Sequence, residues 1–205
     1  MLCVRYLGFS KSERRSTGRN DIDKYTCFKE LKQCENDFVL DICDRRTSVT
    51  ILAPHGGMIE PHTTEIARLI AGDTYNYFCF NGRKEGNNSD LHITSHRYDE
   101  EHAVALVKQS LIVVAVHGCT ILEPTVFLGG LDSCLKDEIA AELTAADIAV
   151  DQPDSAHSGT HRNNICNRGV TGKGVQMECP RPLRDSPDDR VKIAAAVRLA
   201  ISKFT

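Results

Sequence analysis

Two histidines follow predicted strands, where α/β sheets present their ligand-binding side chains, and a glutamate lies close to the first histidine in the chain. His55 follows one short apolar run, and His117 follows another, residues 111–116. Because ligands of open α/β sheets collect at the carboxyl ends of strands, we expect both imidazoles to face one pocket. In the segment PHGGMIE, two glycines permit a bend that brings Glu60 toward His55. Two imidazoles and one carboxylate are a ligand set of catalytic zinc, which leaves a fourth position for water.

A second acidic residue, Glu178, ends the apolar segment 174–178. A carboxylate is costly to bury there unless it has a partner or a task, and acting as general base beside a metal is one such task. Simpler interpretations stay open from the residues alone: Glu60 could favour a helix N-terminus electrostatically, and Glu178 could be a solvated carboxylate at the rim. His92 and His96 lie four apart in an alternating segment, so we interpret them as loop or surface residues.

A loop in the last third of the chain gathers polar side chains suited to anions. The segment HRNNICNR, residues 161–168, holds two guanidinium groups and three carboxamides. We expect Arg162 and Arg168 to pair with substrate carboxylates and Asn164 to orient the substrate, although exposed arginines are often ordinary surface. The whole irregular stretch, residues 153–173, is unusually long for a compact domain unless it has a function.

The remaining sequence predicts one α/β domain that positions these residues. Short apolar runs alternate with stretches of helical period, which is typical of α/β sheets. The predicted strands are residues 48–53, 74–80, 91–95, 111–116, 147–150 and 174–178. The predicted helices are residues 61–71, 99–107, with Asp99 as its cap, 132–146 and 186–203. Residues 1–24 are expected to form a mobile polar leader and residues 25–205 the folded domain.

Composition limits the classes of protein to consider. A chain of 205 residues with 41% apolar and 26% charged residues suits one globular domain and excludes fibrous and disordered classes. The net charge of −3 gives no general attraction to nucleic acid or anionic membranes. The longest apolar run is far below the roughly 18–20 residues that cross a bilayer, and we find no signal-peptide pattern. We therefore expect a location in the cytoplasm, or release by lysis if the source is a phage.

Nine cysteines are present without any Cys-x-x-Cys pair, so we expect free thiols in a reducing compartment rather than a disulfide framework or a structural zinc module.

Six motifs in order resemble the family of phage and bacillary poly-γ-glutamate hydrolases. They run from about Thr47 to the C-terminus and read APHGGMIE, LHITSHRYDE, VAVHGC, GGLD, NNICNRG and GKGVQME. The resemblance implies a fold similar to zinc carboxypeptidases, with a mixed parallel and antiparallel sheet flanked by helices and one zinc ion per chain. It also implies that His55, Glu60 and His117 are the metal ligands and that Glu178 is the catalytic glutamate.

Two features depart from the expected patterns. Carboxypeptidases space the first histidine and glutamate more closely than His55 and Glu60, and the family usually continues with Leu and Ser where Cys179 and Pro180 follow Glu178.

The expected function is zinc-dependent hydrolysis of γ-glutamyl amide bonds in poly-γ-glutamate. Two alternatives stay open: a zinc amidohydrolase of small N-acyl amino acids, and a metal-free module that binds an anionic polymer without cutting it.

Overall fold

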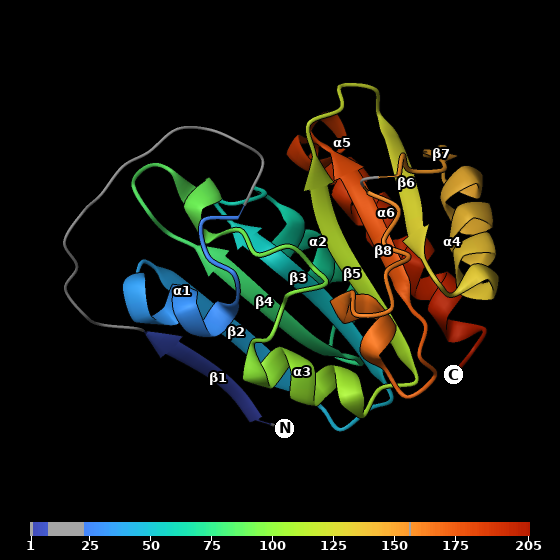
Figure 1. Ribbon diagram of the computed structural model, residues 1–205. Helices are drawn as coiled ribbons and strands as arrows, with labels where there is room; N and C mark the ends of the chain where they lie inside the picture. The colour runs from blue at the N-terminus through green and yellow to red at the C-terminus, as the bar shows by residue number, and fades with distance from the viewer. Residues whose placement is uncertain (1, 8–22, 156) are drawn as a thin grey trace.

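A mixed sheet runs through the part of the chain that the computed structural model describes, residues 2–7, 23–155 and 157–205 (Figure 1). Within these residues it has eight strands in the order β1-β2-β4-β3-β5-β8-β6-β7. The strands are β1 (Leu2–Leu7), β2 (Phe38–Asp44), β3 (Val49–Gly57), β4 (Asn76–Gly82), β5 (Ile112–Cys119), β6 (Thr125–Gly130), β7 (Ala149–Asp151) and β8 (Val175–Pro180). The central strands β4, β3, β5 and β8 are parallel, whereas β1, β2 and β6 pair antiparallel with their neighbours β2, β4 and β8.

Helices cover both faces of this sheet. The α-helices are α1 (Phe28–Cys34), α2 (Thr63–Ala71), α3 (Glu101–Lys108), α4 (Ser133–Ala145), α5 (Arg181–Asp185) and α6 (Pro187–Ser202). Short 3₁₀ helices, η1 (Asn88–Leu91) and η2 (Ile165–Arg168), lie in the described connections. One apolar core packs α2, α4 and α6 against one face, and a second packs α1, α3 and η2 against the other.

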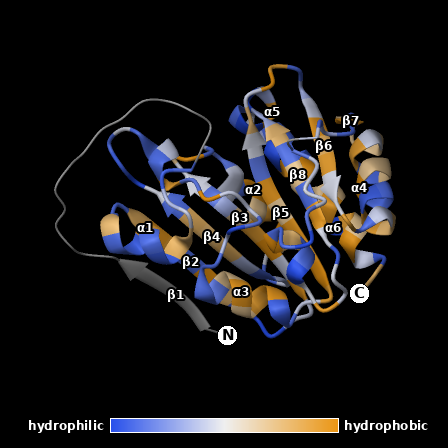
Figure 2. Ribbon diagram, in the orientation of Figure 1, coloured by the Kyte–Doolittle hydropathy of each residue, from blue (hydrophilic) through white to orange (hydrophobic). Residues whose placement is uncertain are grey.

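The alternation of side chains along the central strands decides which face carries the site. In β5, Val114 and Val116 enter the first core and Val113 and Ala115 the second, so the strand is apolar on both faces. Figure 2 shows the apolar residues concentrated along β5 and β8 in the middle of the sheet. His117, next in the alternation after Ala115, therefore lies on the face of the second core.

The predicted fold class is confirmed: the domain is α/β, with a mixed sheet flanked by helices. The likeness to zinc carboxypeptidases stays a prediction. Most predicted elements are present with ends shifted by a few residues, but α1, α5, β1, β2 and β6 were not predicted. In β2 the polar Asp41 interrupts the apolar run, and its buried carboxylate is paired with Arg68 of α2. Because Arg68 is far from Asp41 in the chain, the residues around Asp41 do not indicate this ion pair.

Two local predictions were wrong. Residues 91–95, expected to be a strand, form the end of η1 and an irregular segment. Asp99 does not cap α3; instead Glu100 accepts a hydrogen bond from the backbone N–H of Ala103. Asp99 accepts from the backbone N–H of Phe28, so its carboxylate joins α1 to this segment.

The predicted leader differs from the structure at both of its ends. Leu2–Leu7 forms the edge strand β1, antiparallel to β2. Asp23 is packed against the segment after η1, where its carboxylate accepts hydrogen bonds from the backbone N–H of Thr94 and from His92. Residues 1 and 8–22 lie outside the described residues.

Free thiols lie in several parts of the described chain. Seven cysteines of the described chain are free thiols, four of them buried: Cys27, Cys34, Cys79, Cys119, Cys134, Cys166 and Cys179. None of the described helices combines the length and the apolar character that a membrane span requires.

Candidate active site

A tight turn after the middle of β3 brings Glu60 back to His55, as the glycines of this segment predict. The pairing of β3 with β4 shifts register between Ala53 and Gly56, so the strand is irregular where His55 lies. The backbone N–H of Glu60 then donates to the carbonyl of His55 over 2.8 Å. Gly57 has a φ of 64°, a left-handed conformation that glycine adopts without strain.

We expect Gly57→Ala to destabilise the protein more than the matched substitution Gly172→Ala. Both glycines have similar positive φ values, 64° and 69°, so alanine costs about 1–2 kcal/mol of backbone strain at either place. A Cβ on residue 57 would also lie 2.5 Å from the carbonyl oxygen of Gly82, whereas a Cβ on residue 172 meets nothing within 4 Å. Overpacking of this kind adds about 1–3 kcal/mol.

Thermal unfolding measures the difference. At about 2–4 °C per kcal/mol for a protein of this size, Gly172→Ala should lower Tm by roughly 2–8 °C, and Gly57→Ala by several degrees more. Equal shifts in the two variants would show that the turn yields to the extra atom without cost.

The carboxylate of Glu60 lies between the Nδ1 atoms of His55 and His117. Its Oε1 is 3.0 Å from Nδ1 of His55, and its Oε2 is 3.9 Å from Nδ1 of His117. The backbone N–H of Gly118, at the end of β5, also donates to Oε2 over 2.7 Å. The structure thus brings together the three side chains that the resemblance gives as metal ligands.

The outer nitrogens of both imidazoles are held by the segment after η1. Nε2 of His55 lies 2.9 Å from the carbonyl of Ile93, and Nε2 of His117 lies 3.3 Å from the hydroxyl of Ser95. A carbonyl only accepts, so Nε2 of His55 carries its hydrogen, and Nδ1 is the nitrogen left to face Glu60. Since a carboxylate also only accepts, a positive charge must sit between Nδ1 and Glu60, either a proton or a metal ion.

The ionisation of the three side chains agrees with this geometry. Burial opposes protonation of His55, but the charge of Glu60 and the hydrogen bonds to Glu60 and Ile93 together raise the pKa of His55. Burial also works against ionisation of Glu60, yet the charge of His55 lowers the pKa of Glu60 to about 2. Burial lowers the pKa of His117 to about 3, so this imidazole is neutral. A neutral imidazole, a carboxylate and a second imidazole whose proton can be displaced fit a divalent cation.

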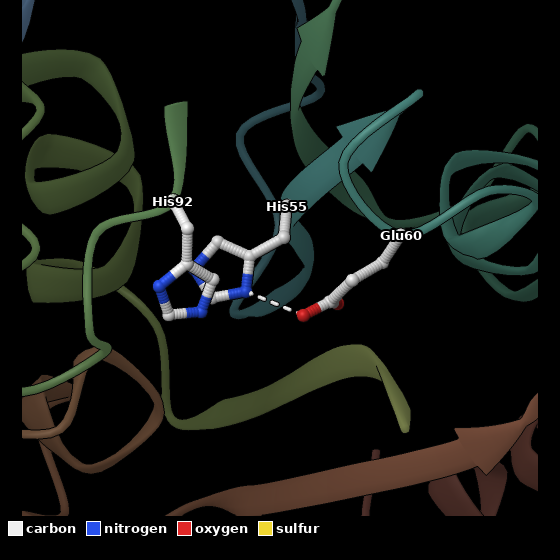
Figure 3. A group of neighbouring side chains, drawn as sticks. All are labelled: His55, Glu60 and His92. Atoms are coloured by element: carbon white, nitrogen blue, oxygen red, sulfur yellow. Dashed lines mark hydrogen bonds and ion pairs between the residues drawn. The ribbon is translucent and has the colours of Figure 1, made fainter. Parts of the chain in front are cut away.

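His92 belongs to the same group, although the sequence analysis interpreted it as loop or surface. Figure 3 shows its ring beside that of His55, with 3.9 Å between the ring centroids. One donor atom from each of His55, Glu60 and His92 lies within 4.8 Å of the others. Nδ1 of His92 is bonded to Asp23 over 2.7 Å. The alternation of residues 91–95 predicted a strand, whereas His92 follows the short helix η1, so the local pattern did not indicate this contact. His96 is exposed as expected.

Glu178 lies beside His117 in the sheet. The two residues are paired in register on the parallel strands β5 and β8, so both side chains project from the same face. Burial and then the charge of Glu60 raise the pKa of Glu178 to about 8. A carboxylate with a pKa near neutrality can both take up and release a proton at physiological pH.

The three residues expected to bind substrate occupy different environments. Arg162 is exposed. Arg168 is half-buried, and its Nη2 donates to the backbone carbonyls of Tyr98 and Ser95. Asn164 is buried, and its Nδ2 donates to the side chain of Gln176 over 2.7 Å. Only Arg162 of the three therefore has its side chain directed largely to solvent.

Arg184 is a residue of the site that the sequence analysis missed. Its guanidinium is buried and donates to the carbonyls of Cys179, at the end of β8, Cys119, at the end of β5, and Pro61, directly after Glu60. It therefore fastens together the three segments that carry the candidate residues. No local pattern marks an arginine in α5 for this position, because its acceptors are three backbone groups from distant parts of the chain.

Comparison with known proteins agrees with the motifs. The pattern of the poly-gamma-glutamate hydrolase family matches residues 25–203. The prophage-derived protein YoqZ of Bacillus subtilis is 36% identical over 162 residues, 76% of this chain. YndL of the same organism is 33% identical over 168 residues, 80% of this chain. The chain spans 58% of the length of YoqZ and 66% of that of YndL.

Two solved structures share the fold over almost their whole length. A bacteriophage poly-gamma-glutamate hydrolase has a TM-score of 0.83 at 25% identity and covers 89% of this chain and 98% of its own. A zinc-free apo form of YndL has a TM-score of 0.84 at 27% identity and covers 89% and 99%. The resemblance seen in the motifs is thereby confirmed, and the chain belongs to the poly-γ-glutamate hydrolase family.

Proposed function

We propose that the protein is a zinc-dependent hydrolase that cleaves γ-glutamyl amide bonds in poly-γ-glutamate. The observation that carries the proposal is the position of the Glu60 carboxylate between Nδ1 of His55 and Nδ1 of His117. The family match supports the substrate, and the apo, zinc-free state of the similar YndL structure supports the metal.

His55, Glu60 and His117 would hold one zinc ion, with His92 beside them. The carbonyl of Ile93 fixes the tautomer of His55, as backbone carbonyls commonly do for metal-binding histidines. When bound, zinc supplies Lewis-acid chemistry: it polarises a carbonyl and lowers the pKa of water. The donation from Gly118 to Oε2 of Glu60 keeps this carboxylate turned toward the two imidazoles.

Glu178 acts as the base in this proposal. It removes a proton from the attacking water and passes it to the nitrogen of the leaving amine, so that one water is consumed for each amide bond broken. Its place beside His117 in the sheet puts it next to one of the proposed metal ligands.

The polymer carries a carboxylate on every residue, whereas the protein has a net charge of −3. Cations near the site are therefore needed to offset long-range repulsion. We assign side-chain pairing to Arg162, which is exposed, and to Arg168, which also anchors the segment of Ser95. Asn164, expected from sequence to orient the substrate, is considered further below.

The test compares three substrates with and without a chelator. Incubation with poly-γ-glutamate should lower the viscosity and release new amino groups, and removal of zinc should abolish both effects until zinc is added back. Elemental analysis should give one zinc per chain. Faster turnover of a small N-acyl amino acid than of a short γ-glutamyl peptide or the polymer would make the small compound the substrate. Binding of the polymer without cleavage and without zinc would refute the proposal that the protein is an enzyme.

A further inference from the structure

The side chain of Gln176 connects Glu178 to the loop that follows β7. Gln176 is buried in β8, two residues before Glu178, so both side chains lie on the same face of the strand. Its Nε2 donates to Oε1 of Glu178 over 2.9 Å and to the backbone carbonyl of His157 over 3.0 Å. Its Oε1 accepts from Nδ2 of Asn164 over 2.7 Å.

These contacts allow only one orientation of the Gln176 amide. The carbonyl of His157 accepts and cannot donate, so it must face the NH₂ group of Gln176. The remaining hydrogen of that NH₂ group then points to Glu178, while the amide oxygen is left for Asn164. Asn164 is oriented in turn, because its Oδ1 accepts from the backbone N–H of Cys166.

Two glycines allow the loop to reach this amide. Gly129 faces Gln176 across the β6–β8 pair, and a Cβ on Gly129 would lie 2.3 Å from the carbonyl oxygen of Ser158. Gly159, with a φ of 63°, packs on Gln176 so closely that a Cβ there would lie 2.9 Å from the Cβ of Gln176. The loop backbone therefore lies directly on the Gln176 side chain.

We propose that Gln176 and Asn164 are positioning residues that hold the carboxylate of Glu178 in one orientation, with Oε1 engaged by Gln176 and Oε2 left for proton transfer. This inference rests on the proposed function, because it takes Glu178 as the base. Asn164 acts through Gln176 and does not touch the substrate. The two residues should therefore affect the rate of the chemical step and not the affinity for substrate.

A purely structural role would give a different result, and Asn167 provides the matched control. Asn167 is also a buried carboxamide of this loop, and it donates to the carbonyls of Gly159 and His161 and accepts from the N–H of Gly174. These hydrogen bonds hold the loop without reaching the side chains of Gln176 or Glu178. Asn167→Ala therefore measures how much kcat changes when only the stability of the loop is reduced.

The first measurement is the kinetics of Gln176→Met, which keeps a similar length and removes the donor. We expect kcat to fall about 10- to 100-fold, the range for a lost hydrogen bond to a charged group, with KM within threefold of wild type and zinc at one per chain. Asn164→Ser keeps an oxygen for the N–H of Cys166 but is too short to reach Gln176, and should lower kcat about 3- to 10-fold. If Gln176→Met does not fold, Asn164→Ser tests the same chain of hydrogen bonds one step earlier, without a change in β8.

The double variant tests whether the two residues act in series. In the Gln176→Met background, Asn164→Ser should lower kcat less than twofold further, because its effect passes through an amide that is no longer there. Asn167→Ala should lower Tm but keep kcat of the folded, zinc-loaded protein within about threefold of wild type.

The outcomes separate this inference from the proposed function. If Glu178→Gln is inactive while Gln176→Met and Asn164→Ser keep wild-type kcat, the positioning role is refuted and the base assignment survives. If Asn167→Ala loses as much kcat as Gln176→Met, or if the two effects multiply in the double variant, loop stability is the explanation and the inference fails. If Glu178→Gln keeps full turnover, another residue is the base, and the positioning role falls with the assignment of Glu178.

Discussion

Glu178→Gln should reduce kcat on poly-γ-glutamate by a factor of about 10²–10⁴, the contribution that a general base makes. The substitution keeps the size of the side chain, and the new amide oxygen can still accept from Nε2 of Gln176, so the surroundings of residue 178 are preserved. What is lost is the ability to take a proton. Zinc content should stay at one per chain, since Glu178 is not among the proposed ligands.

The measurement combines initial rates of amino-group release with elemental analysis of the same samples. Glu85→Gln is the matched control, because Glu85 is exposed in the loop before η1 and should keep wild-type kinetics. Turnover at the wild-type rate in Glu178→Gln would show that another residue is the base. Loss of zinc together with activity would instead make Glu178 part of the metal site.

His117→Ala should release the metal. The neutral imidazole of His117 is one of three proposed ligands, and loss of even an outer partner of a ligand costs about 10- to 100-fold in metal affinity. Loss of the ligand itself should cost more, so dialysed His117→Ala should retain well under one zinc per chain and show no detectable polymer cleavage.

His102→Ala provides the comparison for this experiment. His102 lies on α3 beside Glu100, in another group of side chains close enough to hold an ion, and its removal should leave one zinc per chain. His92→Ala completes the series, because His92 has a donor atom near His55 and Glu60. Full zinc in His117→Ala together with zinc loss in His92→Ala would exchange the two histidines in the ligand set.

The sequence allowed prediction of the positions of those candidate residues that end predicted strands. His117 and Glu178 lie at the ends of apolar runs that really are central parallel strands, and the strand ends meet at one edge of the sheet. His55 and Glu60 are close in the chain, and the glycines between them indicate the turn. In each case a local pattern carries the information, and the geometry of an α/β sheet supplies the rest.

The supporting residues could not be predicted because their partners are far away in the chain. Ile93 and Ser95 hold the two imidazoles from a segment whose alternation suggested a strand. Arg184 acts through three backbone carbonyls, which any sequence provides. Asp23 looked like part of a polar leader until its bonds to His92 and Thr94 tied it to the site. Partner choice of this kind is decided by the tertiary structure.

The direction of the Asn164 side chain also could not be predicted from the sequence. A carboxamide in an arginine-containing loop suggested contact with a ligand, but the side chain is turned inward to Gln176. Arg168 likewise has one nitrogen engaged by the carbonyl of Tyr98. Composition indicated a polar loop with a function, whereas the direction of each side chain depends on how the loop folds over β8.

The contact between this loop and β8 also bears on attempts to redesign the protein. Loops around an α/β sheet are ordinarily regarded as interchangeable parts that can be grafted between relatives to alter selectivity without harm to reactivity. Here residues 157–164 hold the amide that orients Glu178, so a transplanted loop lacking an equivalent of Asn164 would carry a penalty in turnover whatever its fit to a new polymer. A library of such chimeras would need to keep that asparagine fixed.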